Sequence, residues 1–151
     1  MFAVLRVRGP IGIRKDIKHN LELLNLTRVS HCVIYPETDK IKGMLKKGKD
    51  YITWGEISEE ILVKMLTKRG KAYREDGKLV KVPEIYKDIN KIAKEIMESK
   101  KTTKELKIKP VFRLKAPTKG YDRKGIKKTF NEGGVLGYRK EKINSLLNRM
   151  I

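Results

Sequence analysis

The sequence predicts an α+β fold in which a small β-sheet carries two helices on one face. Three short segments have the apolar pattern of strands, and two segments with helical spacing of apolar residues separate them. The order is therefore β-α-β-α-β, completed within residues 1–56. So short a series favours a single layer of helices against a sheet over a doubly wound α/β fold.

Each of the five elements has its own local signal. Alternating apolar residues predict the first strand over residues 1–8. Apolar runs predict the other two strands over 31–35 and 51–54. Between them, apolar residues at helical spacing predict helices over 13–24 and 38–48, and the second helix begins at a threonine N-cap and ends at a glycine.

The remaining two-thirds of the chain is expected to be an extension of this 1–56 core. Residues 57–110 predict a mostly helical insertion: a helix capped by Ser58, a hairpin turning at Asp76-Gly77, and a long amphipathic helix with apolar residues from Ile85 to Met97. Residues 111–138 form a basic, glycine-rich loop, and residues 139–151 a terminal helix.

Positive charge is the dominant feature of the composition. The 151 residues contain 37 Lys and Arg against 18 Asp and Glu, a formal net charge of +19. The surplus is +5 in residues 1–56, +6 in 57–110 and +8 in 111–151, so every part of the molecule is basic. A surplus spread in this way indicates a protein that touches a polyanion on several sides.

The loop over residues 111–138 is the strongest candidate for that contact. From Val111 to Lys140 there are nine Lys or Arg, two acids and five glycines, which argues against a helix or a central strand. Such a segment has little to bury, so residues 115–138 are predicted to become ordered only on a partner. Nucleic acid is the first hypothesis, with candidate RNA-binding residues Arg8, Arg14, Lys15, Arg113, Lys115, Lys119, Tyr121, Arg123, Lys124, Lys127, Lys128 and Arg139.

Aromatic residues near these cations admit two interpretations. Tyr121, Phe130 and Tyr138 can stack on unpaired bases or pack on the core, and packing is favoured for Phe130. Trp54, beside a glycine, is interpreted as a packing residue at the end of the sheet.

The loop that precedes the first predicted helix is a second candidate contact. Arg14 and Lys15 follow Gly9-Pro-Ile-Gly12 and are expected in the first helical turn, where cations oppose the helix dipole. A phosphate bound to the free N–H groups would turn this unfavourable interaction with the helix dipole into a favourable one. The equal alternative is that Arg14 and Lys15 are simply solvated and bind no phosphate.

Catalytic and metal-binding signatures are missing from the sequence. His19 and His31 belong to no linked motif, and the carboxylates are scattered among lysines. Cys32 is the only cysteine and is expected to be a buried strand residue in a reducing, cytoplasmic setting. We expect no enzyme, cofactor, metal, small-molecule substrate or membrane partner.

Motifs along the whole chain resemble the universal large-subunit ribosomal protein family number thirty, in its long archaeal and eukaryotic form. They are Leu5-Arg-Val-Arg-Gly9 with Gly12, Leu23-Leu-Asn-Leu26, His31-Cys32, Pro36-Glu-Thr-Asp39, Gly43-Met44, Trp54-Gly55-Glu56, Pro117 with Gly120, Glu132-Gly-Gly134 with Gly137, Lys142-Ile-Asn144, Leu146-Leu147 and Arg149-Met150. Residues 57–110 fit loosely, as expected of the insertion that separates the long form from the short one.

The resemblance implies a three-stranded antiparallel sheet with two helices, a ferredoxin-like relative. It also implies binding of large-subunit ribosomal RNA beside neighbouring ribosomal proteins, without catalysis. The family often has Pro-Arg-Gly-Gly where this chain has Pro117-Thr-Lys-Gly120, so contact geometry is not carried over to Thr118 or Lys119. The alternatives are a free RNA-binding regulator or RNA chaperone and, from another class, a nucleic-acid-processing enzyme.

Overall fold

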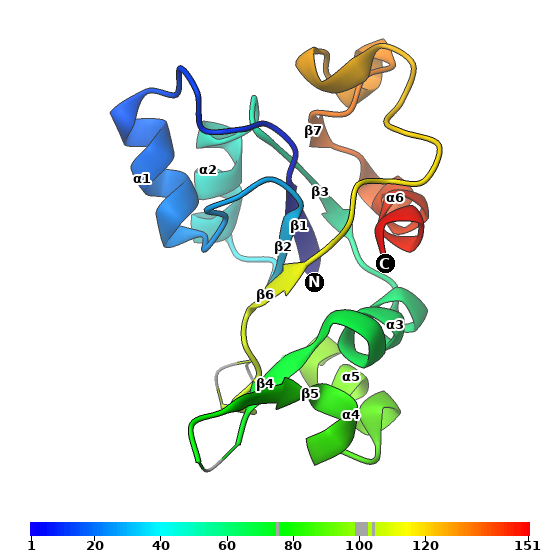
Figure 1. Cartoon of the computed structure of the whole chain (residues 1–151). Coiled ribbons are helices and arrows are strands. Elements are labelled where there is room, and N and C mark those ends of the chain that lie inside the picture. Colours follow the sequence, from blue (N-terminus) through cyan, green and yellow to red (C-terminus); the bar gives the residue numbers. More distant parts are fainter. Residues whose placement is uncertain (75, 99–102, 104) are drawn as a thin grey trace.

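A five-stranded sheet forms the centre of the molecule in the computed structural model, which describes residues 1–74, 76–98, 103 and 105–151 (Figure 1). The three predicted strands are confirmed as β1 Phe2–Arg6, β2 His31–Tyr35 and β3 Ile52–Glu56. Strand β1 lies between the other two and runs antiparallel to both. Two short strands extend the edges, so the order is β6-β2-β1-β3-β7.

Helices α1 (Lys15–Leu23) and α2 (Asp39–Lys47) cover one face of this sheet, as predicted. Because side chains alternate along a strand, Phe2 and Val4 of β1 point to this face. They belong to an apolar cluster that also contains Leu21, Leu24, Leu26, Val33, Leu45 and Ile52. The Thr38 hydroxyl accepts a hydrogen bond from the Ile41 N–H at 3.4 Å and caps α2.

The opposite face of the sheet is buried as well. Ala3, Leu5 and Cys32 lie there, in a larger apolar cluster with residues of α3 (Glu59–Arg69) and α6 (Ile143–Met150). Cys32 is fully buried in β2, which confirms the predicted buried strand residue, and this burial raises the pKa of its thiol to about 12. All five residues of β1 are buried because both faces of the sheet are covered.

The insertion follows β3 and lies below the sheet in Figure 1. After α3 come the predicted hairpin, β4 Lys71–Tyr73 and β5 Leu79–Lys81, and then α4 Val82–Ile85 and α5 Ile89–Met97. The prediction of one long helix is wrong because the chain leaves the helical conformation at residues 86–88. Ser58 occupies the N-cap position of α3, but its side chain makes no capping hydrogen bond.

The basic loop is more structured than its composition indicates. Its start pairs with β2 as β6 Val111–Arg113, and its end pairs in parallel with β3 as β7 Gly137–Tyr138. Short 3₁₀ helices lie at Gly125–Lys127, Phe130–Glu132 and, just after β7, Lys140–Lys142. The expectation that the loop buries little is wrong, because its buried residues include Phe112, Leu114, Val135 and Leu136.

Candidate nucleic-acid interface

The outer surface of the loop carries cations that form no ion pairs with the described residues. Seven of its predicted RNA-binding side chains are exposed, and within the described part of the chain none of the seven forms an ion pair. One of them, Arg113, lies on β6 at the start of the loop. The other six make up the loop exterior: Lys115, Lys119, Arg123, Lys124, Lys127 and Lys128. Tyr121 is half-buried, and burial raises the pKa of its hydroxyl.

Both acidic residues of the loop have local partners. Asp122 forms ion pairs with Arg139 at 2.7 Å and with Arg149 at 3.8 Å. Glu132 accepts a hydrogen bond from the Thr129 N–H at 3.3 Å and completes a capping box. Because Asp122 is paired with arginines and Glu132 is the only other acid of the loop, the charge on the outside of the loop is predominantly positive.

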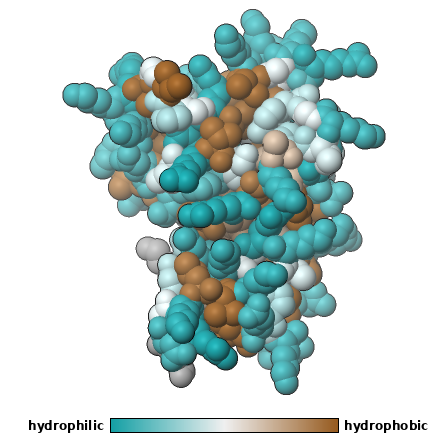
Figure 2. Space-filling model, in the orientation of Figure 1, coloured by the Kyte–Doolittle hydropathy of each residue, from teal (hydrophilic) through white to brown (hydrophobic). Residues whose placement is uncertain are grey.

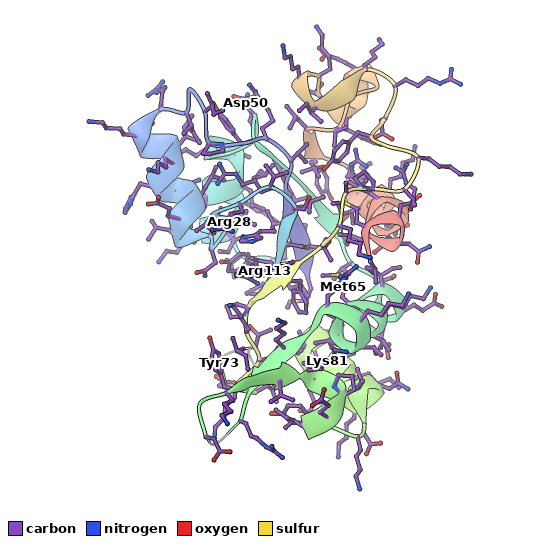
Figure 3. All side chains as sticks on the ribbon, viewed as in Figure 1. Arg28, Asp50, Met65, Tyr73, Lys81 and Arg113 are labelled. Atoms are coloured by element: carbon purple, nitrogen blue, oxygen red, sulfur yellow. The ribbon has the colours of Figure 1, made fainter. Side chains whose placement is uncertain are left out.

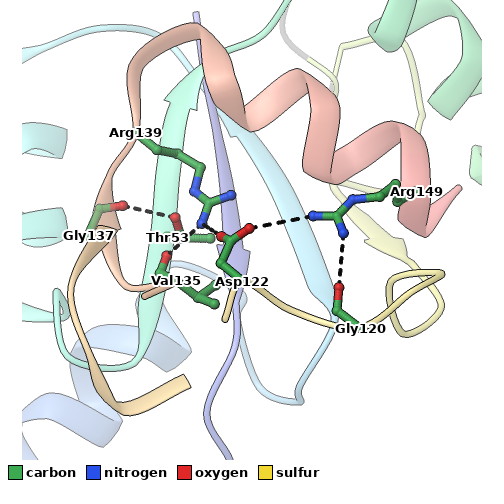
Figure 4. Close-up of polar contacts among 7 residues, drawn as sticks. All are labelled: Thr53, Gly120, Asp122, Val135, Gly137, Arg139 and Arg149. Carbon is green, nitrogen blue, oxygen red and sulfur yellow. Dashed lines mark hydrogen bonds and ion pairs between the residues drawn. The ribbon is translucent and has the colours of Figure 1, made fainter. Parts of the chain in front are cut away.

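Arg139 holds the loop in place rather than contributing to its exterior (Figure 4). Its side chain is only 2% exposed, and it donates to Asp122 and, at 3.2 Å, to the Val135 carbonyl. Nearby, Arg149 donates to the Gly120 carbonyl at 3.0 Å. The structure therefore places Arg139, a predicted RNA-binding residue, beneath the surface formed by its neighbours.

Folding also assembles a cleft that the sequence pattern did not single out. This aromatic cleft, about 660 Å³ in volume, is lined by Lys49, Trp54, Thr129, Phe130, Asn131, Leu136, Gly137, Tyr138, Arg139, Lys140 and Lys142. Arg139 and Lys142 lie over the Phe130 ring at 4.5 and 5.7 Å from its centroid. The residues come from two regions far apart in the sequence, 49–54 and 129–142, so no local motif could have revealed the cleft.

Two aromatic rings form one wall of the aromatic cleft. The centroids of Trp54 and Tyr138 lie 6.2 Å apart, with the rings tilted by 33°. The Tyr138 hydroxyl donates to Glu56, and this hydrogen bond raises the pKa of Tyr138 to about 12. Tyr138 is 41% exposed, so an apolar ring face remains open beside several cations.

The predicted residues near the N-terminus lie at the same end of the molecule as the 3₁₀ helices of the loop (Figure 1). Arg8 lies over the Tyr51 ring at 4.9 Å and donates to the Asp50 carbonyl at 3.1 Å. Lys15 is exposed at the start of α1.

Arg14 occupies the N-cap position of α1 rather than the expected first turn. It forms an ion pair with Asp16 at 3.1 Å. Asp16 thus supplies, from within the chain, part of the negative charge that a bound phosphate was expected to supply at the start of α1.

Arg113 stands apart from the rest of the predicted set. It lies on the edge strand β6, facing the insertion, and Figure 3 shows it across the junction from Lys81 of β5. The structure thus divides the predicted residues among the loop exterior, the α1 end and this junction.

Two other kinds of site are absent from the described residues. They contain no cluster of three or more His, Cys, Asp or Glu side chains placed to hold a metal ion. Among the same residues, no helix is both long and apolar enough to cross a bilayer.

Comparison with known proteins places the chain in a family. The family model described as ribosomal protein L30p/L7e matches residues 2–52. A protein of Nanoarchaeum equitans is 49% identical over 100% of this chain and 99% of its own length. Relatives from Methanosphaera stadtmanae and Staphylothermus marinus are 47% and 42% identical, over 100% of this chain and 100% and 98% of their own lengths.

All three relatives are named large ribosomal subunit protein uL30. The matches run through the insertion and the basic loop, so the resemblance first seen in short motifs extends over the full chain. The chain belongs to the uL30 family of ribosomal proteins.

Proposed function

We propose that this protein is a structural constituent of the large ribosomal subunit that binds and stabilises large-subunit ribosomal RNA in the cytoplasm. The observation that carries the proposal is the loop exterior, where six exposed cations have no ion-pair partner in the described residues and both acids of the loop have local partners. The names of its relatives support the same assignment, and the family is not enzymatic.

Phosphate neutralisation is the main physical contribution in this proposal. Lysine and arginine contacts to the RNA backbone fix position and orientation without reading base identity. Because the loop is anchored at both ends by β6 and β7, its cations stay close to the sheet, where they can meet closely spaced phosphates. Recognition is therefore of RNA shape, with neighbouring ribosomal proteins as further partners.

The aromatic cleft adds a site for an unpaired base. Stacking on aromatic rings is the usual way in which proteins hold single-stranded bases, and nearby cations retain the adjoining phosphates. Trp54 and Tyr138 supply the rings, and Lys49, Lys140 and Lys142 supply the cations.

This mode of binding makes affinity steeply dependent on salt. With about six to ten phosphates bound, the affinity falls by roughly three to five decades between 50 and 200 mM salt, and less for an unpaired target.

Sedimentation of a cell lysate through a high-salt sucrose gradient tests the proposal. We expect the protein in the large-subunit fractions at one copy per subunit. Recovery near the top of the gradient would refute the structural role and favour a free RNA-binding regulator or RNA chaperone.

A further inference from the structure

We propose that a second RNA-backbone site lies at the junction between the insertion and the sheet, separate from the loop exterior. The site is a cleft of about 390 Å³ between the end of α3, the hairpin and β6. We call it the junction groove and define it by its cations: Lys68, Arg69, Lys71, Lys81, Lys109 and Arg113. It deepens the proposed function, on which it rests, by assigning RNA contact to the insertion.

The charge of the junction groove is of one sign. Its other lining residues are Gly70, Leu79 and Val111, so no carboxylate of the described residues lines it. Arg69 donates to the main-chain oxygen of Ile151 at 3.1 and 2.7 Å, and within the described chain none of the other five cations has an ion-pair partner. Hydrophilic side chains cover this junction on the face shown in Figure 2.

The hairpin itself holds like charges together. Lys71 and Lys81 are directly opposed partners of the antiparallel pair β4 and β5, and both are exposed. Like charges directly opposite in a sheet are destabilising, so the folded hairpin carries a repulsion that an anion between the two side chains would remove.

The side of the junction groove formed by the sheet also has an excess of positive charge. Arg113 of β6 is the cross-strand partner of His31 of β2. Burial and then the charges of Arg113, Arg28, Arg6 and Lys109 lower the pKa of His31. Cations from several segments thus raise the positive potential along this edge of the sheet.

A nucleic-acid backbone fits the junction groove better than an acidic peptide does. Among the residues that the structure describes, the lining offers charge but no aromatic ring, and Leu79 and Val111 are its large apolar residues. Protein interfaces rely on a buried apolar or aromatic centre, whereas phosphate contacts need only placed cations. We therefore assign the junction groove to the sugar-phosphate backbone of large-subunit ribosomal RNA.

The test compares three double variants of the full chain for binding to purified large-subunit ribosomal RNA across a salt series. K71Q/K81Q changes the junction groove, and K124Q/K127Q changes the loop exterior. K64Q/K94Q is the matched control, because it removes the same charge from a surface shared with Glu59 and Glu60. Thermal melting by circular dichroism confirms that each variant is folded.

We expect the junction-groove variant to lower the slope of log K against log salt by about two, one for each phosphate that the lysines no longer neutralise. The loop variant should do the same, and the control should leave the slope unchanged. A groove variant that behaves like the control, while the loop variant weakens binding, overturns the inference and leaves the proposed function standing. Failure of the unmodified protein to bind the RNA overturns the proposed function itself.

Lysine acylation of the unmodified protein gives an independent readout. We expect Lys71 and Lys81 to react freely in the isolated protein and to be protected in the complex with purified ribosomal RNA, with Lys64 reactive in both. Protection that occurs only in the assembled subunit would assign the junction groove to a neighbouring protein and overturn the inference.

Discussion

At the residue scale, arginines in and beside the loop have different roles: Arg139 is structural, whereas Arg123 is proposed to face the RNA. Arg139→Met removes the charged partner of Asp122, and Arg149 remains 3.8 Å away as partial compensation. We expect the free energy of unfolding to fall by about 1 to 3 kcal/mol, as for the loss of a charged hydrogen bond inside a protein. Urea titration followed by circular dichroism measures this change.

Arg123→Met is the matched control, because Arg123 is exposed in the same loop. We expect it to change stability by less than about 0.5 kcal/mol while weakening RNA binding. Equal stability losses for the two variants would show that the Arg139 ion pair does not anchor the loop.

His31 makes the stability of the protein depend on pH. Its Nδ1 atom accepts a hydrogen bond from the Arg28 N–H at 3.4 Å, which requires the neutral ring. Burial and then the cations Arg113, Arg28, Arg6 and Lys109 lower the pKa of His31 below its ordinary value of 6.5. The unfolded chain therefore binds the proton more readily than the folded chain. The stability that the neutral His31 ring contributes is complete above pH 6.5 and is lost as the pH falls below it.

Thermal melting between pH 5.5 and 7.5 checks this sign. We expect the melting temperature to fall on acidification, and we expect His31→Gln to flatten the profile. His19→Gln is the control, because His19 is exposed on α1. A profile that stays equally steep in His31→Gln would assign the pH dependence to other groups.

Periodicity predicted the elements whose signals are local. The strands β1, β2 and β3 and the helices α1, α2 and α3 lie within a few residues of their predicted positions. The edge strands β6 and β7 escaped prediction because they pair only two or three residues, and their partners lie far away in the sequence.

The division of the predicted long helix into α4 and α5 has a different cause. Apolar residues continue at helical spacing through Ile85, Ile89 and Ile92, so periodicity alone shows no interruption. The chain nevertheless leaves the helical conformation at Tyr86 and starts again after Asp88, which occupies an N-cap position. The sequence did contain a signal for this second start, because Asp88 precedes an apolar run and aspartate is a preferred N-cap residue.

At the scale of the loop, we expect some residues to be ordered and others to be disordered when no RNA is bound. The sequence predicts disorder throughout 115–138, but Val135 and Leu136 are buried and donate hydrogen bonds to the Lys128 carbonyl. We therefore expect slow amide exchange at these two residues and fast exchange over residues 123–128.

Hydrogen exchange of the isolated protein, read residue by residue, measures this pattern. Buried β1 is the internal standard for slow exchange. Adding ribosomal RNA should slow exchange over 123–128 and leave Val135 and Leu136 nearly unchanged. Strong protection over 123–128 without RNA would contradict ordering on the partner.

For the molecule as a whole, composition indicates a class of partner but not the surfaces that would contact it. Net charge and its spread along the chain indicate a polyanion regardless of fold. The aromatic cleft joins Lys49 and Trp54 to residues 129–142, and the junction groove joins residues 68–81 to 109–113. Both surfaces depend on pairing between distant segments, which residue spacing does not encode.

Trp54 reports directly on the aromatic cleft because it is the only tryptophan in the chain. We expect large-subunit ribosomal RNA to quench its fluorescence through base stacking at about 50 mM salt, and we expect recovery as salt releases the bound phosphates. Inorganic polyphosphate is the matched control, since it offers the same charge without bases and should leave the fluorescence largely unchanged. Equal quenching by polyphosphate, or none by RNA, would show that Trp54 and Tyr138 only pack on the sheet, whereas selective quenching places an unpaired base beside them.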